Sequence, residues 1–319
     1  MTDVVYRHYC GGDERAIVQL WNECLRVDPI TTDRFQKTVL LDANFDPEGL
    51  RLAFCGDDLI GAVFAVRRLL PMMGTDLEPN TGWIPWFFIA EEHRRQAVGA
   101  KLMEAALAFL SSHGRTEAIF SGYAPNYILP GIDEHSYPEG YRFLCSQGFE
   151  ITESSVSMDA KLIGYQMPAG IKELRRSKEA EGYFFGALSP DDLVAVIRFA
   201  GTVFYPDWAR ALREAVYRGV PLSRIRVARG PDSRIVGFCM YGGYSDIQER
   251  FGPFGVDPNA QGTGIGKILF HDCLTAMREE GLHGAFFLWT DEQSSAGHLY
   301  KNAGFEVSRR FHVMKKRLG

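Results

Sequence analysis

The chain has 319 residues, of which 46% are hydrophobic and 13% aromatic, and its formal net charge is −5. This length and apolar content support a full core divided between two domains, and the net negative charge argues against nucleic-acid or membrane partners. No apolar run approaches the roughly 20 residues of a membrane span. The six cysteines are scattered without a C-x-x-C pair, which indicates free thiols, no metal site and a cytoplasmic location.

The first half of the chain predicts a strand at residues 4–6, a helix start at residues 12–14 and a second helix after the sequence IAEEHRRQAVGAKL, which begins at Ile89. The apolar residues of this second helix recur at helical spacing; they are Val98, Leu102, Ala105, Ala106 and Phe109. A loop rich in Pro, Gly, Tyr and Asn follows at residues 122–140. Loops of this kind often carry substrate contacts, and a structural lid between domains is an equal alternative.

A connector divides the chain. Residues 153–162 predict the last strand of the first half, and the charged run within residues 164–181 predicts a solvated helix face. Residues 183–185 then restart the pattern of residues 4–6, and the sequence SPDD after Leu188 is a helix start with a serine cap, a proline and acids in the first turn. The expected domains are residues 1–163 and 182–319, joined by a linker at 164–181.

Residues 254–267 read FGVDPNAQGTGIGK and are the most informative stretch of the chain. A short apolar strand ends at Val256, and three glycines between Gly262 and Gly266 lead into a helical pattern that starts at Ile265. A strand that turns through glycines into a helix leaves several backbone N–H groups unpaired and directed at one place. The stretch therefore predicts an anion site suited to a pyrophosphate.

Two other phosphate motifs and an ordinary turn compete with this interpretation. A Walker A loop is excluded because Gln261 stands where the motif requires its first glycine and Ile268 where it requires Ser or Thr. A dinucleotide fingerprint is disfavoured because the glycine spacing is G-x-G-x-G rather than G-x-G-x-x-G. An ordinary glycine-rich turn before a helix stays open on these residues alone.

The elements after the loop alternate between helix and strand. Residues 285–290 predict a buried strand and residues 305–314 a closing strand. Between them, Ser294 or Ser295 can cap a helix that ends at Gly304. The helix before them has one apolar face, formed by Ile265, Ile268, Leu269, Cys273 and Ala276.

These residues resemble the acetyl-CoA motifs of the GCN5-related N-acetyltransferase (GNAT) superfamily. The first family pattern is Val-x-Pro followed by Gln/Arg-x-x-Gly-x-Gly/Ala, and it is met by Val256, Pro258, Gln261, Gly264 and Gly266. The second is Asn-x-x-Ala-x-x-Leu-Tyr-x-x-x-Gly-Phe, and it is met by Ala296, Leu299, Tyr300, Gly304 and Phe305. Gln293 replaces the asparagine of the second pattern.

A weaker copy of both patterns lies in the first half. When Ile89 is aligned with Val256, Arg94 falls on Gln261, Ala97 on Gly264 and Gly99 on Gly266, and Leu144 falls at the position of Tyr300. The resemblance therefore implies a mixed-sheet α/β fold (α+β) with two GNAT-like acyl-CoA N-acyltransferase domains in tandem. Because Leu144 replaces the tyrosine, we expect the first domain to be degenerate and the second to be catalytic.

The resemblance also implies the site residues. Tyr300 stands at the family's general-acid position, and Glu249 or Asp246 precedes the strand where the family often places a general base. The alternatives are a core role for Tyr300 and a surface role for the two acids. A backbone N–H near Gly255 or Val256 would stabilise the oxyanion. The residues expected to contact the cofactor are Phe254, Gly255, Val256, Gln261, Gly262, Thr263, Gly264, Ile265, Gly266, Lys267, Gln293 and Ala296 in the second domain, and Arg94, Arg95, Gln96, Ala97, Val98, Gly99 and Ala100 in the first.

The reaction implied is direct attack of an amine on the thioester of acetyl-CoA (coenzyme A), which needs no Cys or Ser nucleophile. We expect acetyl-CoA as the cofactor, a small-molecule amine as the acceptor, and a monomer or homodimer. The acceptor contacts are expected at residues 199–218, where aromatic and polar side chains are mixed. Two alternatives stay open, namely a non-catalytic acyl-CoA-binding or sensor module and N-acetylation of a protein or peptide amine.

Overall fold

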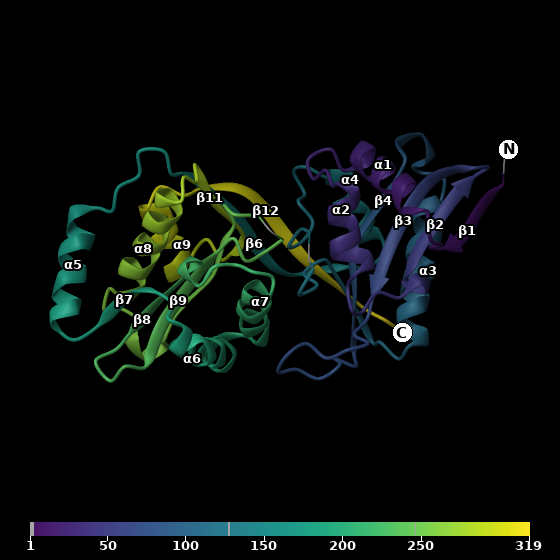
Figure 1. Ribbon diagram of the computed structural model, residues 1–319. Coiled ribbons are helices and arrows are strands. Elements are labelled where there is room, and N and C mark those ends of the chain that lie inside the picture. The colour runs from purple at the N-terminus through teal and green to yellow at the C-terminus, as the bar shows by residue number, and fades with distance from the viewer. Residues whose placement is uncertain (1–2, 127, 246) are drawn as a thin grey trace. The chain divides into compact units, whose positions relative to one another are not determined.

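The computed structural model describes residues 3–126, 128–245 and 247–319 and divides the chain into two compact units (Figure 1). The first unit comprises residues 1–71, 76–155 and 310–319, and the second comprises residues 72–75 and 156–309. Strands and helices follow one another in the same order in both halves, β-α-α-β-β-β-α-β-α-β. This shared order confirms the tandem repeat of a mixed α/β fold that the sequence predicts.

The first unit is built on a sheet in which β1 to β4 are antiparallel neighbours and β5 joins β4 in parallel. Helix α1 covers one face, where the Trp21 ring lies 5.1 Å from the Trp86 ring, and α3 covers the other. The elements are β1 (Val4–His8), α1 (Glu14–Cys24), α2 (Thr32–Phe35), β2 (Leu50–Cys55), β3 (Asp58–Val66), β4 (Thr81–Ile89), α3 (Val98–Ser112), β5 (Glu117–Phe120) and α4 (Pro138–Ser146).

The second unit has an antiparallel sheet in the order β10-β9-β8-β7, with a separate apolar cluster on each face. Adjacent residues of β9 show the alternation: Phe238 packs with α6 and α7, whereas Cys239 packs with α8. The elements are α5 (Ala169–Ala180), β7 (Phe184–Ala187), α6 (Leu193–Phe199), α7 (Pro206–Tyr217), β8 (Ile225–Arg229), β9 (Ile235–Tyr241), β10 (Phe251–Val256), α8 (Ile265–Glu279), β11 (Gly284–Thr290) and α9 (Ser295–Asn302).

Two long strands, β6 (Glu150–Lys161) and β12 (Glu306–Arg317), each contribute to both units. Residues 156–161 of β6 pair with β11 of the second unit, and residues 314–317 of β12 pair with β5 of the first. Each half of the sequence therefore supplies the strand that extends the sheet of the other half. This exchange is the main difference from the expected domains 1–163 and 182–319, because a strand's partner is set by pairing and not by its place in the chain.

The expected linker at residues 164–181 contains a helix, α5, that belongs to the second unit. Its Arg175 donates to Asp272 Oδ1 of α8 at 2.7 Å and to the Phe185 carbonyl at 2.7 Å. Arg226 of β8 donates to the other oxygen of the same carboxylate, also at 2.7 Å. Asp272 is only 4% exposed, so one buried carboxylate joins α5, α8 and β8.

The loops that precede α3 and α8 have the same backbone conformation despite different residues. Gly262 and Gly264 have φ of 77° and 89°, in the left-handed region that glycine adopts at no steric cost. At the equivalent positions Arg95 and Ala97 have φ of 60° and 63°. A side chain in this region costs about 1–2 kcal/mol, so the first loop keeps its shape under strain.

Among the described residues, no helix is both long and apolar enough to cross a membrane. No group of three His, Cys, Asp or Glu side chains in that part of the chain could hold a metal ion, and all six cysteines are free.

Replacing Asp272 with Asn is expected to lower the free energy of unfolding by about 3 kcal/mol, because two half-buried guanidinium groups lose the buried carboxylate that pairs with both. The matched control is Glu179→Gln, which removes the second, more exposed partner of Arg175, 2.8 Å from its Nε. That change is expected to cost less than about 1 kcal/mol. Urea unfolding of both variants measures the difference, and equal losses would contradict the central role of Asp272.

Replacing Ala97 with Gly is expected to raise the free energy of unfolding by about 0.5 kcal/mol, because relief of the left-handed strain exceeds the entropy cost of glycine. The control is Ala108→Gly at an exposed position inside α3, where the same change is expected to cost about 1 kcal/mol. Opposite signs in urea unfolding are the expected outcome; a loss of stability in both variants would refute strain at Ala97.

Candidate active site

In both units the two central parallel strands separate after a short paired stretch. Strand β4 pairs with β5 only over residues 81–84, so residues 85–89 leave that neighbour. Among the described residues, β10 and β11 meet only through a bridge between Arg250, just before β10, and Phe286. The separating strands also carry register shifts, between Phe64 and Val66 opposite β4 and between Phe251 and Phe254 in β10. Such irregularities redirect a strand and are common beside active sites.

The loop after β10 supplies the predicted anion site of the second unit. Gln261 donates from Nε2 to the Val256 carbonyl at 3.5 Å, and Thr263 donates to the Ala260 carbonyl at 2.6 Å, which fix the turn. The N–H groups in the first turn of α8 have no intrahelical partners. Gln261, Gly262, Thr263 and Lys267 are exposed, so these donors and one positive charge lie at the surface. Ile265 is buried in the core.

The corresponding loop of the first unit is held in the same way. Arg94 donates from Nε to the Ile89 carbonyl at 3.2 Å, which matches the bond from Gln261 to Val256. Gln96 donates to the Glu92 carbonyl at 2.7 Å, and Val98 is buried. Glu139, in the first turn of α4, accepts from Arg94 at 3.2 Å and from Arg95 at 3.1 Å. The sequence analysis did not find this carboxylate, because its contact joins residues far apart in the chain.

Tyr300 lies against both separated strands of the second unit. Its ring centroid is 4.5 Å from Phe287 of β11 and 6.1 and 6.3 Å from Phe251 and Phe254 of β10. The residue is 6% exposed, and its hydroxyl has no hydrogen-bond partner among the described residues. Burial raises the pKa of Tyr300, so the phenol keeps its proton at neutral pH. The equivalent residue of the first unit, Leu144, is fully buried.

Glu249 stands where β10 and β11 part. Its carbonyl accepts from the Phe286 N–H at 3.0 Å, and its half-exposed side chain has no partner within the described part of the chain. The other acid proposed as a base, Asp246, lies outside the described residues. Gln293 is exposed and Ala296 half-buried at the start of α9, where Ser294 caps the helix by accepting from the Gly297 N–H at 3.0 Å.

Gly255 is required by packing against an aromatic ring. A Cβ atom at this position would lie 2.5 Å from the Phe204 ring, which itself stacks on Trp208 at 5.0 Å. The sequence analysis considered this position for a backbone N–H that stabilises the oxyanion; the structure supplies a steric reason for the glycine that needs no ligand. Gly264 has a similar second constraint, because a Cβ there would lie 2.8 Å from Leu174 of α5.

The first unit holds a cavity of about 940 Å³ beside the unpaired half of β4. This volume is at the upper end of typical ligand sites, about 300–1,000 Å³. Of the first-unit residues predicted to contact the cofactor, Arg94, Arg95, Ala97, Gly99 and Ala100 line it, whereas Gln96 and Val98 do not. The cavity therefore lies in the half of the chain that the sequence led us to regard as degenerate.

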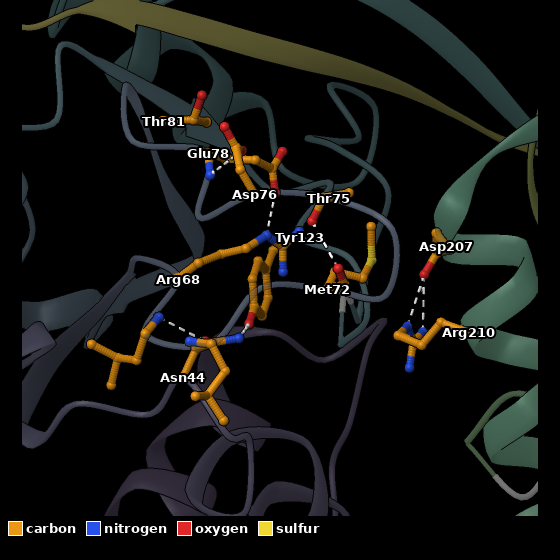
Figure 2. A network of polar contacts seen from close by, with 12 residues as sticks. Asn44, Arg68, Met72, Thr75, Asp76, Glu78, Thr81, Tyr123, Asp207 and Arg210 are labelled. Carbon is orange, nitrogen blue, oxygen red and sulfur yellow. Dashed lines mark hydrogen bonds and ion pairs between the residues drawn. The ribbon is translucent and has the colours of Figure 1, made fainter. Parts of the chain in front are cut away.

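One wall of this cavity comes from the long loop after β5, and a buried polar cluster anchors the loop (Figure 2). The Tyr123 hydroxyl accepts from Asn44 Nδ2 at 2.7 Å and donates to Asp42 Oδ1 at 3.0 Å. The Arg68 guanidinium lies 5.5 Å from the Tyr123 ring centroid and forms an ion pair with Glu78. These contacts fix the start of the loop that carries Ile128, Leu129 and Ile132 to the cavity.

Comparison with known families and structures agrees with this geometry. Residues 15–126 match the family described as "Acetyltransferase (GNAT) family", and residues 222–307 match "Acetyltransferase (GNAT) domain". Comparison with curated protein sequences gives no match.

Three solved structures illustrate the fold. A glucosamine N-acetyltransferase region of a fungal multi-domain GH3 β-N-acetylglucosaminidase superposes with a TM-score of 0.82 at 16% identity, over 99% of this chain and 38% of that one. A GCN5-related N-acetyltransferase from Sphaerobacter thermophilus gives 0.73 at 15%, over 99% and 96%. A tandem GNAT protein from the clavulanic acid biosynthesis pathway gives 0.64 at 15%, over 99% of both chains.

The chain thus spans little more than a third of the length of the fungal protein and nearly all of the other two. At these identities the structural likeness establishes the fold alone, and the two sequence matches establish the family. The chain contains two GNAT acetyltransferase domains in one polypeptide.

Proposed function

We propose that the protein is an acetyl-CoA-dependent N-acetyltransferase whose second unit transfers an acetyl group to the amine of a small molecule. The observation that carries the proposal is the position of Tyr300, a protonated phenol packed against both β10 and β11 where these strands separate. A thiolate that leaves between the strands would find a proton donor there, as general-acid catalysis requires.

The geometry of the second unit also suits the cofactor. Exposed N–H groups at the start of α8 and the Lys267 ammonium suit a pyrophosphate. The edge of β10 from Phe254 to Val256 is free of a strand partner on the β11 side in the described part of the chain, and it suits the amide groups of pantetheine. Acetyl-CoA would supply the thioester whose carbonyl the amine attacks.

The remaining residues have defined roles in this proposal. A backbone N–H near Gly255 or Val256 would stabilise the oxyanion, and Tyr300 would give its proton to the departing sulfur. Glu249, at the point where β10 and β11 separate, would accept a proton from the attacking ammonium through water. Gln293 and Ala296, at the start of α9, would contact the pantetheine.

We infer a small amine as the acceptor. In the segment expected to contact it, Arg210 is already held by Asp207 at 3.0 Å (Figure 2) and by Glu214, and it is 8% exposed. Tyr205, by contrast, is 64% exposed and available. Because one structural neighbour is described as a glucosamine N-acetyltransferase, amino sugars are the first acceptors to test.

An acyl-CoA-binding role without catalysis is the second candidate, and it applies to the first unit. Leu144 at the position of Tyr300 removes the proton donor, whereas the cavity beside β4 is retained. N-acetylation of a protein or peptide amine has no comparable observation in its favour.

The Tyr300→Phe variant is expected to lower kcat at pH 7 by about 100-fold with little change in acetyl-CoA affinity, because only proton donation is lost. The deficit is expected to shrink above about pH 8.5, where the thiolate of CoA is stable without a proton. Since burial raises the pKa of Tyr300, the wild-type donor stays protonated across this range.

The control is Tyr241→Phe, which removes another buried hydroxyl of the same unit, bonded to Glu280 at 2.9 Å. Its kcat is expected to match the wild type. The measurement is CoA release with a panel of amino sugars, other amines and peptides. A Tyr300→Phe enzyme with unchanged turnover at pH 7 would remove this residue from the mechanism.

A further inference from the structure

The cavity of the first unit has a charged rim. The charged side chains that line it are those of Arg26, Arg94, Arg95, Arg142 and Glu139, so four positive groups face one negative group. Arg94 and Arg95 stand at the start of the loop before α3, where helix N–H groups also favour an anion. This end of the cavity suits phosphate groups.

The other end of the cavity is apolar, and it lies on the opposite face of the sheet, beside the unpaired half of β4. Trp86 and Phe88 of β4 point to the α1 face, where their rings lie 5.1 and 5.7 Å from Trp21. Phe87 points to the opposite face and lies 5.3 Å from Phe143 of α4. Residues from both faces line the same cavity, so it passes beside the unpaired half of β4 from one face to the other.

On the α1 face the lining residues are uncharged apart from the exposed Arg26; they are Trp21, Cys24, Leu25, Val27, Trp86 and Phe88. The Cys24 thiol donates to the Ile89 carbonyl at 3.3 Å, and burial raises its pKa to about 11, so it stays neutral. A hydrogen bond of 2.5 Å from the Tyr137 hydroxyl to Asp28 Oδ2 joins the segment after α1 to the start of α4. We call this part of the cavity the chamber; its lining is mostly apolar, and none of the lining residues on this face carries a negative charge.

We propose that the first unit binds an acyl-CoA whose acyl chain is longer than acetyl. The arginine rim holds the phosphates, and the apolar chamber on the α1 face holds the chain. An acetyl group alone would leave most of that chamber without apolar contacts. This site is separate from the one proposed in the second unit, so each can fail without the other.

Glu139 weakens the affinity of the arginine rim for phosphate. Its carboxylate occupies Arg94 and Arg95, so a phosphate must compete for the same two guanidinium groups. Replacement of Glu139 with Gln removes the competing charge while keeping the size of the side chain. This variant is expected to bind every CoA ligand about threefold more tightly.

The test measures the binding of CoA, acetyl-CoA, hexanoyl-CoA and decanoyl-CoA to the full chain. Binding is monitored by titration calorimetry and by tryptophan fluorescence, since two tryptophans line the cavity. Affinity is expected to rise by about two- to fourfold for each added methylene until the chamber is filled. Equal affinity for acetyl-CoA and decanoyl-CoA would overturn the proposal.

Variants locate the site. Leu25→Asp, at a half-buried position of the chamber, is expected to abolish the dependence on chain length, whereas Arg95→Ala is expected to weaken all ligands by a similar factor of about ten. Arg234→Ala is the control for Arg95, because both side chains are 85% exposed and Arg234 does not line the cavity. Its affinities are expected to equal those of the wild type.

Gly262→Asp places a negative charge in the anion loop of the second unit. Binding that depends on chain length is expected to persist in this variant while acetyl transfer is lost. If instead Gly262→Asp removes the binding of decanoyl-CoA, or Leu25→Asp keeps the dependence on chain length, the first unit is not the site. Loss of acetyl transfer in Tyr300→Phe bears only on the second unit.

Discussion

The separation of the two central parallel strands is the constraint on which both candidate sites depend. A strand that is paired on both sides has its backbone groups satisfied, whereas the last residues of β4 and the length of β10 leave one edge for another partner. Because an exposed edge is costly or hazardous, it is usually covered. Here aromatic side chains from α4 and α9 lie against the separated strands, and an extended ligand with amide groups can complete the pairing.

The two units keep this backbone framework and differ in the side chains placed on it. The loop before α3 has the same left-handed residues as the loop before α8, although Arg95 and Ala97 pay a steric cost that Gly262 and Gly264 avoid. The second unit keeps a phenol at Tyr300, and the first has Leu144. The first unit has a cavity of about 940 Å³ and a long loop anchored by Asp42, Asn44 and Tyr123. The same framework thus carries a buried phenol in the second unit and borders a ligand-sized cavity in the first.

Local signals in the sequence were sufficient for the parts of the structure that local physics determines. Short-range rules predict the left-handed Gly264 before α8 and the serine cap at Ser294, and the structure shows both. The alignment of Arg94 with Gln261 is also seen, since each side chain donates to the carbonyl at the end of the preceding strand. The exchange of β6 and β12 could not be predicted in this way, because strand partners are chosen by contacts between distant residues. The same reason applies to Glu139 on the two arginines and to the Phe204 ring at Gly255, where a glycine that suited a catalytic explanation has a packing one.

The reciprocal placement of β6 and β12 makes the two halves of the chain interdependent. If a protease cut the connector at residues 162–168, each fragment would carry the strand that pairs with β5 or β11 of the other. The fragments would then form a heterodimer held by main-chain hydrogen bonds. Neither could be purified as a closed domain, because its sheet would end in an open edge. A duplication that began as two separable domains would, once the strands were exchanged, be unable to return to independent single-domain proteins.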